Sequence, residues 1–257
     1  MHSVQRGPVI GVGALVMALV VLQASVGLGP AAWVIAMTSA VGAGVLLGRA
    51  MRHHGTTRLG PADWVTLSRA VLGQVVTALV VESFVGREHR GLIVTLTVVA
   101  LALDAVDGRV ARATGTMSAL GARFDMEVDA SLILVLSVAT VPILGWWVLL
   151  IGAARYALMV SEFIWPWLKS AVPQRYWRKV VAAIQGIVLT AAVAQVLPLT
   201  VMVGVTLAAT ALLAESFGRD VWWLRRHRDG RLPHRRPRAT VAEIALPEIA
   251  LPEPADA

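Results

Sequence analysis

Four aspartates stand at regular intervals in an otherwise apolar part of the chain. Asp104 and Asp107 are three residues apart, and Asp125 and Asp129 are four apart. On an α-helix each pair lies on one face, one turn apart. Hard carboxylate oxygens suit Mg²⁺ or Mn²⁺, and such ions usually act on phosphate groups. Because four carboxylates at the edge of a bilayer repel one another unless cations bind between them, the pattern predicts a divalent-metal centre.

The composition indicates that this centre belongs to a membrane protein. The chain has 257 residues, of which 57% are hydrophobic and 15% charged, and its mean hydropathy is +0.70. Soluble domains of this size do not normally carry so much apolar sequence, so we expect an all-α, polytopic membrane helix bundle. The chain has no cysteine, which excludes disulfides, thiolate metal sites and cysteine nucleophiles.

Eight apolar segments are expected to form the helices that position the aspartates. They cover residues 8–28, 31–47, 63–84, 92–113, 118–141, 146–165, 180–196 and 200–213, and the last can continue to 223. The first aspartate pair falls near the end of the fourth segment and the second pair in the fifth. Ser118 is placed to cap the start of the fifth helix. The first segment is too long for the core of a typical signal peptide.

The distribution of Lys and Arg predicts the orientation in the membrane. With a cytoplasmic N-terminus, the cation-rich loops at 49–62, 109–123 and 166–179 and the C-terminal tail all fall inside. Outside turns at 28–30, 142–146 and 197–199 carry no Lys or Arg, and only Arg87 and Arg90 fall on the wrong side. We therefore expect a multi-pass protein of the cell membrane, with both termini and the aspartates at the cytoplasmic face.

A strongly basic run follows the last helix. It holds eight Arg between 219 and 238. Beside a membrane helix such a run more often contacts anionic lipid than nucleic acid, so membrane lipids are the expected partner and nucleic acid is not. Residues 239–257 are Pro-punctuated and are expected to be disordered.

The acidic stretch resembles the signature of the CDP-alcohol phosphatidyltransferase family. That signature reads Asp-x2-Asp-Gly-x2-Ala-Arg-x8-Gly-x3-Asp-x3-Asp. Every fixed position is met here, by Asp104, Asp107, Gly108, Ala111, Arg112, Gly121, Asp125 and Asp129. The resemblance implies a six-helix catalytic core at 59–224. Two extra N-terminal transmembrane helices, expected within 1–58, and a cytoplasmic tail at 225–257 fall outside it.

The resemblance also implies a reaction. Such enzymes transfer a phosphatidyl group from a CDP-linked lipid, such as CDP-diacylglycerol, to an alcohol and release CMP in phospholipid biosynthesis. The implied cofactor is Mg²⁺ or Mn²⁺, as a pair of ions, with Asp104, Asp107, Asp125 and Asp129 as ligands. Asp129 is also the implied general base that takes the proton from the acceptor hydroxyl. Family members are commonly homodimers.

Small residues and cations of the signature are the implied nucleotide-binding groups. Gly108, Ala111 and Gly121 are small where the nucleotide approaches the backbone, and Arg112 can pair with a phosphate in bidentate fashion. For Gly121, plain helix packing explains the glycine equally well.

A second segment supports the resemblance. Asp63-x2-Thr66-x2-Arg69 is similar to the Asn-x2-Thr-x2-Arg pattern of the family's first core helix, with Asp in the Asn position. Thr66 and Arg69 are therefore further binding candidates. The alternative is that Asp63 caps the helix and that Thr66 and Arg69 are interfacial.

The acceptor alcohol is left open. Arg155 lies inside the sixth segment, where a charge is costly unless it faces a polar cavity. With Arg175, Arg178 or Lys179 it could bind the phosphate of a phosphorylated acceptor such as glycerol 3-phosphate or inositol phosphate. The loop cations also satisfy the positive-inside rule alone, and an unphosphorylated alcohol such as serine stays open.

A function of another class is also open. A transporter that binds a permeating divalent cation would need an acidic cluster too. Its acids would be expected nearer the middle of the membrane, and it would not need Gly108, Ala111 and Arg112, so the enzyme is favoured.

Overall fold

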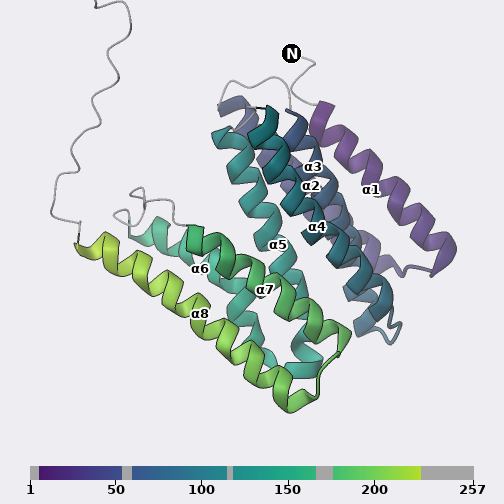
Figure 1. The fold of residues 1–257 in the computed structure, drawn as a ribbon. Coiled ribbons are helices and arrows are strands. Elements are labelled where there is room, and N and C mark those ends of the chain that lie inside the picture. The colour runs from purple at the N-terminus through teal and green to yellow at the C-terminus, as the bar shows by residue number, and fades with distance from the viewer. Residues whose placement is uncertain (1–5, 54–59, 115–117, 166–175, 227–257) are drawn as a thin grey trace, which may run out of the picture.

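The computed structural model describes residues 6–53, 60–114, 118–165 and 176–226, and all regular secondary structure in these residues is helical. It contains α1 (Arg6–Ser25), α2 (Pro30–His53), α3 (Pro61–Phe84), α4 (Arg90–Thr114), α5 (Ala119–Leu144), a 3-10 turn (Trp146–Val148), α6 (Leu149–Ile164), α7 (Tyr176–Ala194) and α8 (Leu199–Arg226) (Figure 1). The predicted all-α bundle is confirmed.

Six of these helices are long and apolar enough to cross a membrane, namely α1, α2, α3, α5, α7 and α8. The other two differ for separate reasons. The second half of α4 carries Asp104, Asp107 and two arginines, which lower its hydropathy, and α6 has only 16 residues. Both still form helices where the sequence predicts them.

Helix ends differ from the predicted ends by a few residues. Pro142 lies inside α5, which continues to Leu144 instead of ending at 141. A proline in the last turn removes one backbone hydrogen bond, and here the Gly145 N–H still closes the helix by donating to the Val141 carbonyl. At the other end of α5, Ser118 caps the helix by accepting the Gly121 N–H, as predicted.

The two helices that carry the aspartates are held by common neighbours. α4 and α5 each pack against α3 and also against α7, and in the described part of the chain they share little direct packing with each other. α1 and α2 cover another side of α3, so α1 and α8 lie on opposite flanks of the bundle (Figure 1). A side chain from α3 can therefore reach both acidic helices at once.

Arg87 and Arg90, the two arginines that do not follow the positive-inside rule, have partners at the ends of the helices opposite to the aspartates. Arg87 donates to the Gly27 carbonyl at 2.8 Å and pairs with the buried Glu82 at 3.5 Å. Glu82 also accepts the Gly29 N–H at 2.6 Å. These contacts fasten the turn between α1 and α2 to the end of α3. Arg90 ties the start of α4 to Gln195, beyond the end of α7, at 2.6 Å.

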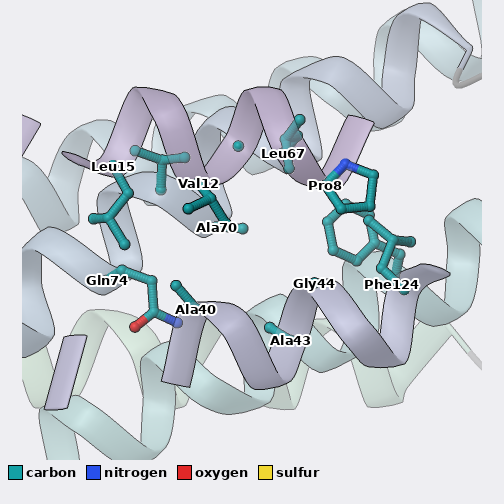
Figure 2. Close-up of a pocket in the computed structure, with 13 residues that line it drawn as sticks. Pro8, Val12, Leu15, Ala40, Ala43, Gly44, Leu67, Ala70, Gln74 and Phe124 are labelled. Carbon is teal, nitrogen blue, oxygen red and sulfur yellow. The ribbon is translucent and has the colours of Figure 1, made fainter. Parts of the chain in front are cut away.

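An apolar pocket lies between α1, α2 and α3 (Figure 2). It is lined by Pro8, Val12, Leu15, Ala40, Gly44 and Leu67, among others, and Phe124 of α5 closes one end. Its lining residues on α3, which include Leu67 and Gln74, fall on the side of that helix turned away from Arg69. The pocket is therefore separate from the aspartates and belongs to the packing of the N-terminal helices.

Candidate metal centre

Three of the four signature aspartates meet on one guanidinium group. Arg69 of α3 pairs with Asp104 of α4 at 2.9 Å, with Asp125 of α5 at 2.5 Å, and with Asp129 of α5. Its Nη1 atom serves Asp104 and Asp125, and its Nη2 atom serves Asp129. Three aspartates, each 35 or more residues from Arg69 in the sequence, thus converge on this one side chain.

Arg69 is the most deeply placed member of this cluster. Its side chain is 1% exposed, whereas those of Asp104, Asp125 and Asp129 are 40%, 32% and 32% exposed. Its remaining donor, Nε, is bonded to the Ala100 carbonyl of α4 at 3.2 Å. A buried guanidinium needs such complete partnering because an uncompensated charge in the bundle is very costly. Arg69 therefore forms the floor of the cluster, and the carboxylates face outward from it.

The carboxylates are close enough together to hold a divalent cation. One oxygen from each of Asp104, Asp125 and Asp129 lies within 4.8 Å of the others. All three are hard oxygen donors of the kind that Mg²⁺ and Mn²⁺ prefer, and each acid keeps an exposed fraction that a ligand can reach. Three ionised carboxylates carry three negative charges, and the guanidinium of Arg69 balances one of them. A divalent cation would balance the other two. The donor set fits one or more divalent ions.

Several signature residues fall where side chains lie outside the described part of the structure. Asp107, Ala111 and Arg112 belong to α4, but their side chains are not described, so their roles stay predictions. Gly108 lies in the same helix and is partly buried. Their place in α4 follows directly after Asp104, as the sequence predicts.

The Asp63-x2-Thr66-x2-Arg69 segment opens α3. Asp63 is the third residue of the helix and accepts the N–H of Gly60, the N-cap residue, at 2.8 Å. It thus closes the first turn from inside the helix, rather than from the N-cap position itself. Thr66 is buried, and its hydroxyl donates to the Ala62 carbonyl at 3.2 Å. Arg69 is the member of this segment that forms ion pairs with Asp104, Asp125 and Asp129.

Arg155 is paired on the other side of α5. It binds Glu127 at 2.6 Å, and Glu127 sits between Asp125 and Asp129 in sequence but on the opposite face of the helix. This partner is 28 residues away in the sequence. Glu127 was the signal that could have been found in the sequence, since an Arg inside an apolar helix needs a carboxylate within reach.

The start of α7 brings another cation to the aspartates. Lys179 is exposed and lies close enough to Asp104 for their charges to interact. Its neighbour Arg178 instead pairs with Asp220 of α8 at 3.4 Å. The loop at 166–175, which includes Arg175, lies outside the described residues. Among the acceptor-site candidates in the described part of the chain, Lys179 is therefore the one whose charge acts on Asp104.

Comparison with known proteins identifies the family. A family model described as CDP-alcohol phosphatidyltransferase matches residues 59–214. No curated protein and no solved structure gives a match. The match spans most of the described bundle and includes α3, α4, α5 and the whole signature segment. The chain belongs to the CDP-alcohol phosphatidyltransferase family, and it is an integral membrane protein.

Proposed function

We propose that this protein transfers a phosphatidyl group from CDP-diacylglycerol, or a closely related CDP-lipid, to a phosphorylated alcohol. The observation that carries the proposal is the convergence of Asp104, Asp125 and Asp129 on Arg69. The three aspartates lie close together, their side chains are partly exposed, and all three pair with the buried Arg69.

Asp104, Asp125 and Asp129 would hold the metal, and we propose that Asp107 joins them. When bound, the metal neutralises the diphosphate of the CDP-lipid and stabilises the charge that develops on the departing CMP. Arg69 keeps the three carboxylates at fixed positions, because each of its three nitrogens is committed to a partner on α4 or α5. The site is therefore organised before substrate arrives.

The proposed reaction is a single displacement at phosphorus. Asp129 takes the proton from the acceptor hydroxyl, and the hydroxyl oxygen forms a bond to the β-phosphorus of the CDP-lipid. The bond between that phosphorus and the oxygen of CMP breaks, and CMP leaves with the electron pair. The products are CMP and a phosphodiester lipid. Gly108, Ala111 and Arg112 are proposed to receive the nucleotide, and Thr66 is proposed to line the same site.

Lys179 is proposed to bind the phosphate of the acceptor. It comes from α7, which packs against both acidic helices, while Arg69 comes from α3 on their other side. A phosphate held by Lys179 would place the hydroxyl of a small molecule near Asp104 and its neighbours. Arg155 is less suited to this role because Glu127 already neutralises it. Glycerol 3-phosphate and inositol phosphate have the required chemistry.

We further propose that the site faces the cytoplasm, where CDP-lipids and phosphorylated alcohols are available, and that two copies of the chain form a homodimer. The orientation rests on the Lys and Arg content of the loops, which follows the positive-inside rule. The homodimer rests on the family, whose members are commonly homodimers.

An acceptor panel tests the proposal. Purified protein in lipid vesicles would receive CDP-diacylglycerol and Mg²⁺, with one acceptor at a time, and the lipid product would be identified by mass. A new phosphodiester lipid with a phosphorylated acceptor supports the proposal. Product with serine alone would show that the transfer is right and the acceptor class wrong. Mn²⁺ uptake by the vesicles, without any lipid product, would support a transporter instead.

Lys179→Met is expected to weaken acceptor binding specifically. Loss of one charge-assisted contact to a phosphate should raise the KM for the phosphorylated acceptor about tenfold or more, with the KM for CDP-diacylglycerol nearly unchanged. Steady-state kinetics with each substrate varied in turn measure both constants. Arg225→Met, which removes an exposed cation from the last turn of α8, is the control and should change neither. Equal rises in both KM values would contradict the assignment of Lys179.

A further inference from the structure

A carboxylate oxygen occupies the place where residue 121 would carry a side chain. A Cβ atom added to Gly121 would lie 2.5 Å from Oδ1 of Asp63 and 3.1 Å from Oγ of Ser118. Non-bonded carbon and oxygen atoms do not approach this closely. Gly121 therefore cannot accept even a methyl group while Asp63 keeps its position.

Both partners are fixed by the starts of their own helices. The other oxygen of Asp63, Oδ2, accepts the Gly60 N–H at 2.8 Å, so rotating the side chain away from Gly121 would break the first turn of α3. The N–H of Gly121 is bonded to the Ser118 hydroxyl at 2.9 Å, in the cap of α5. The carboxylate also lies over the first turn of α5, where the helix dipole favours a negative charge.

This contact lies on the same pair of helices as the ion pairs of the metal centre. Asp63 precedes Arg69 by six residues on α3, and Gly121 precedes Asp125 by four on α5. At about 1.5 Å of rise per residue, the two contacts are only about 6–9 Å apart along the helices. Any sliding or rotation of α3 on α5 at Gly121 would therefore move the guanidinium of Arg69 relative to Asp125 and Asp129.

We propose that Asp63 and Gly121 form an interlock that sets the register of α3 on α5 and so positions Arg69 among the aspartates. Asp63 is a positioning residue, and residue 121 is glycine because Asp63 fills the space beside it. Of the two explanations that the sequence left open for Gly121, close approach of the nucleotide and helix packing, this proposal takes helix packing. The consequence for activity rests on the proposed function, whereas the contact itself does not.

The test is a double-mutant cycle with Gly121→Ala and Asp63→Ala. Gly121→Ala should lower the melting temperature in detergent and reduce kcat for CMP release about tenfold or more, because the added methyl group pushes α3 from its register. Asp63→Ala should cost less, since it removes a helix cap and leaves open space. In the double variant the 2.5 Å contact with Asp63 is gone and only the milder 3.1 Å contact with Oγ of Ser118 remains. Both melting temperature and kcat should therefore return close to the level of Asp63→Ala alone.

Two further variants make the cycle specific. Asp63→Asn has nearly the shape of Asp63, so it should not rescue Gly121→Ala, whereas Asp63→Ala should. Gly42→Ala, on α2, adds a methyl group that meets nothing within 4 Å and should leave both readouts unchanged.

The outcomes separate the interlock from the reaction. If the wild-type protein releases no CMP, the proposed function fails, and the melting temperatures still decide the interlock. Melting-temperature effects that simply add in the double variant would overturn the contact. Restored melting temperature without restored kcat would overturn the positioning role and return Gly121 to the nucleotide site.

Discussion

Arg69→Met is expected to abolish CMP release and to destabilise the protein. The guanidinium is buried and is the common partner of Asp104, Asp125 and Asp129. Methionine fills much of the same volume but leaves three carboxylates facing one another with no compensating charge. Breaking a buried ion pair by removing one partner costs about 3–5 kcal/mol. We expect a lower melting temperature in metal-free detergent and no measurable turnover.

Metal ions should partly reverse the loss of stability in this variant. With Arg69 gone, the carboxylates need another cation, so Mg²⁺ or Mn²⁺ should raise the melting temperature of Arg69→Met more than that of the wild type. Arg90→Met, which removes an exposed arginine paired with Glu88 and Gln195 at the far end of the bundle, is the control. Wild-type turnover in Arg69→Met would show that the aspartates do not need the guanidinium to stay in position.

Asp129→Asn is expected to remove catalysis while preserving the fold. The amide has the shape of the carboxylate, and its oxygen can still accept a hydrogen bond from Arg69, so the melting temperature should change little. It cannot take a proton from the acceptor hydroxyl, and it is a poorer ligand for a divalent cation. Loss of a general base alone costs about a hundredfold to ten-thousandfold. We expect kcat for CMP release to fall by at least that range.

Glu127→Gln is the matched control for this prediction. Glu127 lies two residues away on the same helix, on the opposite face, and pairs with Arg155 instead of Arg69. The variant loses one negative charge at nearly the same depth in the membrane. It should keep most of the activity. A similar loss of kcat in both variants would mean that the charge of α5, rather than the specific place of Asp129, governs the rate.

Much of the architecture could be predicted from the sequence because local patterns determine it. Apolar length predicts the helices, and the spacing of Asp125 and Asp129 puts both acids on one face of α5. Ser118 was identifiable as a cap from its place after a turn. The end of α5 was predicted too early because Pro142 was interpreted as a break, although a proline near the end of a helix removes only one hydrogen bond.

What the sequence could not predict depends on which helices become neighbours. The pairing of Arg69 with three aspartates could not be predicted from its motif, because it depends on α3 packing against both α4 and α5. The Glu127–Arg155 pair and the Asp63–Gly121 contact likewise join helices that are separate in sequence. Periodicity shows which face a residue occupies, and only the packing shows what that face meets.

The most direct test of the central claim is the metal dependence of CMP release from CDP-diacylglycerol by the purified, full-length protein. We predict no release in the presence of a chelator, full release when Mg²⁺ or Mn²⁺ is restored, and no recovery by either ion in Asp125→Asn. Release that persists without divalent cations, or that recovers in Asp125→Asn as it does in the wild type, would contradict a metal centre at Asp104, Asp125 and Asp129.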